Sequence, residues 1–60
     1  MKDNRKEIEE AFHTYMEEAN SFWDKGNKSA GTRARAALMN IKNLVHAERT
    51  AIQDKKNSEK

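Results

Sequence analysis

Residues 25–35, KGNKSAGTRAR, contain both glycines of the chain and separate an acidic, aromatic stretch from a basic, aliphatic one. Gly26 can adopt the left-handed conformation that commonly ends a helix, and Asn27 is well suited to accept a hydrogen bond from the first N–H groups of a following helix. A connection of about two residues is within the usual range for a helical hairpin. The stretch therefore predicts two helices that meet at a turn over residues 26–27.

The residues before the turn have the periodicity of one long helix. Apolar side chains recur at spacings of four and three residues, which is typical of a helix with one face against a partner. These side chains are Ile8, Phe12, Tyr15, Ala19 and Phe22, and Trp23 widens the stripe. We expect a helix over about residues 4–25, capped by Asp3 or Asn4.

An acidic row follows the opposite face of this first helix. It consists of Asp3, Glu10, Glu17 and Asp24, which stand seven residues apart. We interpret this acidic row as a solvated surface that keeps the helix soluble. The alternative is self-regulation, in which the acidic row competes with nucleic acid for a basic surface on a neighbouring subunit.

The residues after the turn continue the same spacing. One stripe contains Ala34, Leu38, Ile41, Val45, Glu48 and Ile52, and one flank contains Ala30, Ala37, Leu44 and Ala51. We expect a helix over about residues 28–54 and a short polar basic tail over residues 55–60. Gly31 is unfavourable in a helix by about 1 kcal/mol relative to alanine. We attribute it to close packing of the two backbones near the turn.

These patterns predict an all-α fold, a coiled-coil-like antiparallel two-helix hairpin over residues 1–54. A single core in a 60-residue chain gives little net stability unless a disulfide, a metal or self-association adds to it. The chain has no cysteine, so it can form no disulfide. We therefore expect the hairpin to dimerise into a four-helix arrangement. The residues expected in the core or the oligomer contact are Ile8, Phe12, Tyr15, Phe22, Trp23, Leu38, Ile41, Val45 and Ile52.

A basic row is the most informative pattern of the second helix. It consists of Lys28, Arg35, Lys42, Arg49 and Lys56, at steps of seven residues. Each step is about 10.5 Å on an ideal helix, and the row stays straight only if the helices supercoil. The alternative is that these residues flank the seam and bridge to acids of the first helix. Because the acidic row lies on the far face, we favour DNA or another polyanion as the partner.

The expected DNA-binding residues are basic and hydroxyl side chains of the turn and the second helix: Lys25, Lys28, Ser29, Thr32, Arg33, Arg35, Lys42 and Arg49. The start of this helix also offers free N–H groups and the positive end of the helix dipole, which favour an anion. No Asn, Gln or aromatic neighbour suggests base reading or stacking. We expect contacts with phosphates of double-stranded DNA and little sequence preference.

The distribution of charge supports an acidic partner. The net charge of +2 divides into −4 over residues 1–24 and +6 over residues 25–60. The chain has no apolar run of the length that spans a membrane and no apolar block typical of a secretion signal. We expect a protein of the cytoplasm and nucleoid.

No pattern in the chain indicates an enzyme. His13 and His46 lack neighbouring ligands, so we expect no metal, and we expect no other cofactor or small-molecule substrate. Ser29 and Thr32 have no adjacent base to activate them as nucleophiles. They can instead donate hydrogen bonds to phosphate.

The run KGNKSAGTRARAALMNIKNLVHAERTAI resembles the bacterial histone-H-one-like family, the linker-histone-like nucleoid proteins known from chlamydiae. The likeness is carried by the turn at residues 25–28, by Ala30, Gly31, Arg33 and Arg35, and by the aliphatic-basic helix that follows. The resemblance implies a DNA-binding, chromosome-compacting protein without catalytic activity. Chlamydial members carry a long lysine- and alanine-rich tail, whereas residues 55–60 are short, so we expect the hairpin to make the DNA contacts.

Two functions of different classes follow from these observations. The first is a small histone-like nucleoid protein that binds the DNA backbone and helps compact or bridge DNA. The alternative is a helical module for protein–protein interaction or oligomerisation. A strong dependence of DNA affinity on salt distinguishes the first from the second.

Overall fold

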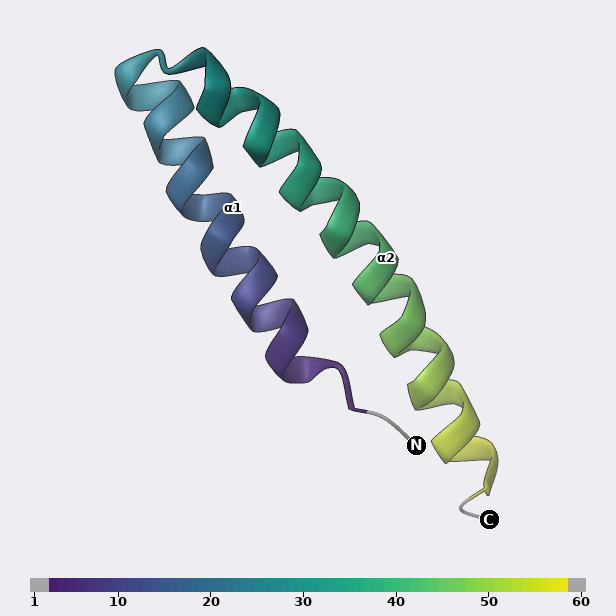
Figure 1. The fold of residues 1–60 in the computed structure, drawn as a ribbon. Helices are drawn as coiled ribbons and strands as arrows, with labels where there is room; N and C mark the ends of the chain where they lie inside the picture. The colour runs from purple at the N-terminus through teal and green to yellow at the C-terminus, as the bar shows by residue number, and fades with distance from the viewer. Residues whose placement is uncertain (1–2, 59–60) are drawn as a thin grey trace.

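The computed structural model describes residues 3–58, and its two helices form an antiparallel hairpin (Figure 1). Helix α1 spans Arg5–Lys25 and helix α2 spans Lys28–Ser58. The hairpin is a slim rod that measures 51 × 14 × 13 Å. No strand occurs among residues 3–58, and the predicted all-α hairpin is confirmed.

The turn has the geometry that its residues predicted. Gly26 is left-handed, with φ 71° and ψ 22°, and its N–H donates to the Phe22 carbonyl at 3.0 Å. The Asn27 side-chain oxygen accepts a hydrogen bond from the Ala30 N–H at 3.2 Å. The first helix therefore ends at a glycine, which adopts the left-handed conformation without the steric cost of a Cβ atom. The second helix begins at the side-chain cap of Asn27.

The start of α1 is held by two neighbouring residues. The Asp3 carboxylate accepts bonds from the Arg5 backbone N–H at 2.9 Å and from Arg5 Nε at 2.8 Å. The Asn4 side chain makes no capping bond, but the residue is buried, and its backbone N–H donates to Glu48 Oε1 at 3.2 Å. Glu48 thus joins α2 to the end of α1 that is remote from the turn.

Helix α2 extends farther than expected. Residues 55–58, which were expected to belong to the tail, are helical. Ser58 Oγ donates to the Asp54 carbonyl at 2.8 Å, and Lys55 and Lys56 lie in the last turn, where the helix dipole favours positive charge. Neither glycine nor proline interrupts this segment. Glu59 and Lys60 lie outside the described residues. The longer helix continues past the start of α1 (Figure 1).

The seam between the helices is made mostly of alanine. The buried apolar residues are Ala11, Ala19, Ala30, Ala34, Ala37 and Ile41. Near the turn the Phe22 ring lies against Gly31, where a Cβ atom would stand 2.6 Å from Cδ1. Close backbone packing at Gly31, as expected from the sequence, is therefore confirmed. Small residues let the two helix axes approach closely, which leaves little room between them for large side chains.

The seam on α2 includes Ala34, Ile41 and Glu48 of the expected stripe together with alanines of the flank, but not the three larger members of the stripe. Leu38, Val45 and Ile52 are 47%, 40% and 52% exposed. These three side chains are therefore largely exposed within the hairpin, whereas the alanines and Ile41 are buried in the contact. Ile52 also lies beyond Glu48, which already faces the start of α1.

The expected core residues of α1 separate in the same way. Ile8, Tyr15 and Phe22 are partly buried, whereas Phe12 is 52% and Trp23 is 77% exposed. Within one hairpin, Phe12 and Trp23 are therefore surface residues. Any burial of these two side chains would require contacts beyond residues 3–58 of one hairpin.

Candidate nucleic-acid interface

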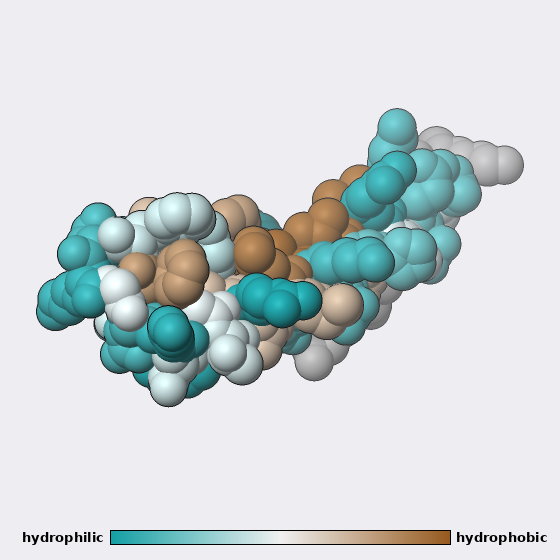
Figure 2. Space-filling view, turned by 90° about the horizontal axis from the view of Figure 1, so that it is seen from above, coloured by the Kyte–Doolittle hydropathy of each residue, from teal (hydrophilic) through white to brown (hydrophobic). Residues whose placement is uncertain are grey.

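The large exposed apolar side chains border the basic row on α2. Leu38, Val45 and Ile52 each follow a member of the row by three positions, so the two sets are neighbours on the helix surface. Hydrophobic side chains form a broken band on the molecule, with hydrophilic side chains on both sides (Figure 2). This face of α2 therefore combines exposed apolar side chains with a basic edge.

The basic row makes no ion pair with the residues that the structure describes. Lys28, Arg35, Lys42, Arg49 and Lys56 are all exposed. Within residues 3–58 none of them forms an ion pair, and the described pairs involve other residues. The alternative in which the row bridges to acids of the first helix is thus not observed in the hairpin. The charges of the row remain available to a partner.

Arg33 differs from the basic row in both position and partner. Its Nε donates to Glu18 Oε2 of α1 at 2.9 Å. Arg33 and Arg35 are two positions apart, which places their side chains about 200° apart around the helix axis. The ion pair also neutralises part of the charge that Arg33 would present to DNA. Of the two arginines, Arg35 is the better placed to act with Lys42 and Arg49.

The remaining predicted contacts gather at the turn. Lys25, Lys28, Ser29 and Thr32 are exposed. The Ala30 N–H donates to the Asn27 side-chain oxygen, and the Gly31 N–H donates to the Asn27 carbonyl at 3.2 Å. The start of α2 therefore combines the positive end of the helix dipole with the side chains of Lys28 and Ser29. This arrangement favours an anion at the turn.

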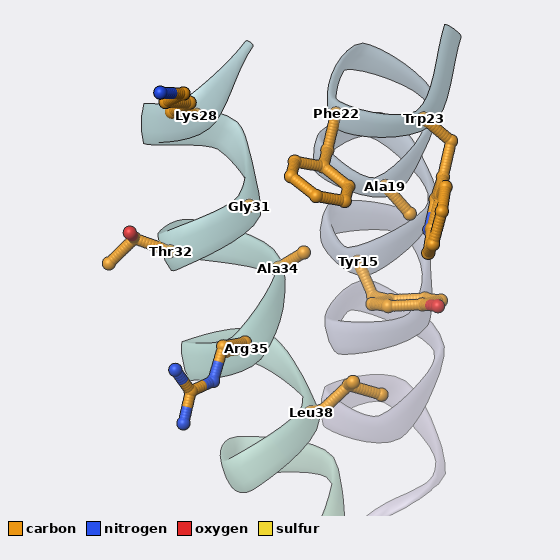
Figure 3. Close-up of a pocket in the computed structure, with 10 residues that line it drawn as sticks. All are labelled: Tyr15, Ala19, Phe22, Trp23, Lys28, Gly31, Thr32, Ala34, Arg35 and Leu38. Atoms are coloured by element: carbon orange, nitrogen blue, oxygen red, sulfur yellow. The ribbon is translucent and has the colours of Figure 1, made fainter. Parts of the chain in front are cut away.

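A groove near the turn brings aromatic and basic side chains together. It has a volume of about 390 Å³, and its lining includes Tyr15, Phe22, Trp23, Lys28, Thr32, Arg35 and Leu38. In Figure 3 the rings of Tyr15 and Trp23 lie over α1, and Lys28 and Arg35 lie at α2 across the groove. Phe22 points toward Gly31 and forms part of the floor. We call this feature the turn-end groove.

The turn-end groove contradicts the expectation that no aromatic residue neighbours the basic residues. That expectation considered neighbours along the chain, whereas Trp23 and Tyr15 of α1 line the same groove as Lys28 and Arg35 of α2. A signal for this proximity was present in the sequence. Residues at similar distances from the turn lie side by side, as Phe22 does with Gly31 and Glu18 with Arg33.

The acidic row is exposed along its whole length. Glu17 lies 3.6 Å from His13 Nε2 on α1, and Asp3 binds Arg5. The side-chain hydrogen bond from Arg5 lowers the pKa of Asp3 below its ordinary value of 3.8. Among the residues that the structure describes, no group of His, Cys, Asp or Glu is arranged to hold a metal ion.

The chain matches a known protein family. The family model described as "Histone H1-like protein Hc1" matches residues 2–58, which is nearly the whole chain. No curated protein and no solved structure matches the chain. In the described part of the chain, neither helix has the length and apolar character needed to cross a membrane.

Proposed function

Because this chain belongs to the histone H1-like Hc1 family, whose members are DNA-binding proteins rather than enzymes, we propose that its hairpin binds the phosphate backbone of duplex DNA through the basic row. The observation that carries this proposal is the row itself, whose charges are exposed and make no ion pair within residues 3–58. The protein acts in the nucleoid, where it helps to compact DNA.

The length of the row suits a duplex. Lys28 and Arg49 are about 32 Å apart on an ideal helix, close to the roughly 34 Å of one turn of B-DNA. A straight rod with cations about 10.5 Å apart can contact phosphates along one side of such a turn. Lys25, Ser29 and Thr32 add contacts at the turn. Arg33 contributes less, because Glu18 holds its guanidinium.

Backbone binding of this kind has little sequence preference. Phosphate contacts fix position but carry no direct sequence information. The four residues from Lys28 to Arg49 in the row are lysine or arginine, which bind phosphate as readily as bases. Affinity for unrelated duplexes should therefore be nearly equal.

The second part of the proposal is that two hairpins associate. The hairpin buries mainly alanines, and no large side chain is fully buried in the described part. Phe12 and Met16 on α1 and Val45 on α2 remain 52%, 51% and 40% exposed. Association through these residues would bury apolar surface that is costly in water. A dimer with two basic rows can also bridge two DNA segments.

The experiment that tests DNA binding by the row is a comparison of matched charge variants. Arg35→Gln with Lys42→Gln removes two members of the row. Lys6→Gln with Lys55→Gln removes the same charge elsewhere. The first variant should bind every duplex at least about tenfold more weakly, because each lost phosphate contact costs about 1 kcal/mol or more. The second should bind nearly as the parent does. Equal losses would contradict the assignment to the row.

A protein–protein module remains the second candidate function, and the exposed apolar residues favour it. If that were the function, the row variant would leave association unchanged and the parent would bind duplex DNA only weakly at physiological salt. Sedimentation across a concentration series, with and without DNA, separates the two. Dissociation on dilution supports the dimer, whereas a monomer at tens of micromolar would rule it out.

A further inference from the structure

The turn-end groove is a partly enclosed apolar feature that also carries cations. Its volume of about 390 Å³ lies within the range of small-ligand sites. Ala19, Gly31 and Ala34 are small and leave the space open, while Phe22 closes it on the side of the seam. The groove is therefore a product of the same small residues that bring the helices together.

One aromatic side chain in this groove is unusually accessible. Trp23 is 77% exposed, although tryptophan is normally well covered in folded proteins. The Phe22 ring meets Trp23 edge to face, with ring centroids 5.0 Å apart and planes at 80°. This contact helps to orient the indole while leaving much of it uncovered. Tyr15 offers a second ring in the same groove.

The cations at the groove distinguish it from a purely apolar contact. Lys28 and Arg35 line the groove on the α2 side, and neither is in an ion pair with any described residue. Thr32 belongs to the same lining. No member of the acidic row lines the groove, so its charge complements an anion. An aromatic surface beside unneutralised cations matches a base and its attached phosphate.

We propose that the turn-end groove binds an unpaired nucleobase by stacking on Trp23 or Tyr15, while Lys28 and Arg35 hold the adjacent phosphate. This inference rests on the proposed DNA binding and extends it to single strands, frayed ends and unwound segments. Stacking is indifferent to base identity, because every base has a π-face. In an intact duplex the bases are already stacked on each other, so the groove can contact only the phosphates.

The proposal predicts that the groove and the basic row bind different parts of a nucleic acid. The row contacts phosphates of any nucleic acid, whereas the groove adds affinity only for unpaired bases. Loss of the stacking surface should weaken single-strand binding by about 5- to 100-fold. Duplex binding should change by less than about twofold, since no base can reach the groove.

The test uses the single tryptophan of the chain as its reporter. Oligothymidylate and a mixed-sequence duplex are titrated separately into the full chain, and Trp23 emission is followed. Single strands should quench the emission strongly and the duplex only slightly. Trp23→Ala should lower the affinity for oligothymidylate, measured by anisotropy of a labelled strand, and Trp23→Phe should restore most of it. Ile52→Ala is the control, because it removes an exposed apolar residue remote from the groove.

The outcomes separate the two proposals. If neither nucleic acid binds, the proposed function fails. If both bind but single strands leave Trp23 emission unchanged, or Trp23→Ala weakens single-strand and duplex binding equally, the groove proposal is overturned and the proposed function stands. If the emission shifts to the blue with protein concentration alone and DNA causes no further change, a second copy occupies the groove, which also overturns the proposal.

Discussion

The ring of Phe22 occupies the space that a side chain on Gly31 would need. A Cβ atom at residue 31 would stand 2.6 Å from Phe22 Cδ1 and 2.8 Å from Cε1, distances that real Cβ contacts do not show. Gly31 therefore lets α1 and α2 meet at the turn with an aromatic ring between them. The glycine has a low helix propensity, but a larger residue at this position would clash with the Phe22 ring.

Gly31→Ala should destabilise the hairpin in spite of the better helix propensity of alanine. The clash with Phe22 costs about 1 to 3 kcal/mol, as overpacking usually does, and the propensity gain offsets about 1 kcal/mol. Thermal or urea unfolding followed by circular dichroism measures the net loss. In a Phe22→Ala background the same substitution should stabilise the hairpin by about 1 kcal/mol. If Gly31→Ala has the same effect in both backgrounds, the contact does not explain the glycine.

Asn27→Ala should lower the free energy of unfolding by about 1 kcal/mol, because the Ala30 N–H loses its side-chain cap. The matched control is Asn43→Ala, which replaces an exposed asparagine within α2. Alanine is the better helix former, so this control should be neutral or slightly stabilising. Equal destabilisation by both changes would argue against the cap.

Much of the fold follows from short-range chemistry that is legible in the sequence. Gly26 and Asn27 specify the turn, and the spacing of apolar residues specifies two helices. The spacing does not decide which flank of α2 faces α1, because Ala37 and Leu38 are adjacent and both belong to a broad apolar stripe. That choice depends on how closely the two helices approach. The alanines of both helices permit a close approach, which leaves Leu38 about half exposed at the edge of the contact.

The sequence predicted the basic row of the candidate site but not the aromatic side of the turn-end groove. The basic row lies on one helix, so its exposure follows from its period. The aromatic residues of the turn-end groove lie on the other helix. Only the antiparallel packing of α1 against α2 places Trp23 in the same groove as Lys28 and Arg35. Arg33 was included among the expected DNA-binding residues because it lies near the start of the second helix, but its guanidinium pairs with Glu18 of α1.

Ile41→Ala should destabilise the hairpin by about 2 to 5 kcal/mol, because Ile41 is the largest buried apolar side chain of the seam. Phe12→Ala, at a position that is half exposed, should cost much less when the protein is dilute. If the hairpins dimerise, the cost of Phe12→Ala should grow with protein concentration. Unfolding curves at several concentrations check both expectations. An Ile41→Ala variant as stable as the parent would show that the seam is misplaced.

The start of α1 should loosen in acid. The hydrogen bonds and charge of Arg5 lower the pKa of Asp3, so the carboxylate stabilises the folded chain at pH values above its ordinary pKa of 3.8. This contribution should disappear as the pH falls from 3.8 through the lowered pKa. A nuclear magnetic resonance titration of the Asp3 carboxyl carbon measures the shift. Arg5→Gln should move the titration toward its ordinary value, and an unchanged midpoint would contradict the role of Arg5.

The most direct test of binding through the basic row is the salt dependence of affinity for one duplex. Four phosphate contacts per chain, from Lys28, Arg35, Lys42 and Arg49, give a slope of log affinity against log salt of about −3.6. Replacing these four residues by glutamine should remove most of that slope while the circular dichroism spectrum stays helical. A folded variant that retains the slope of the parent would contradict DNA binding by the row.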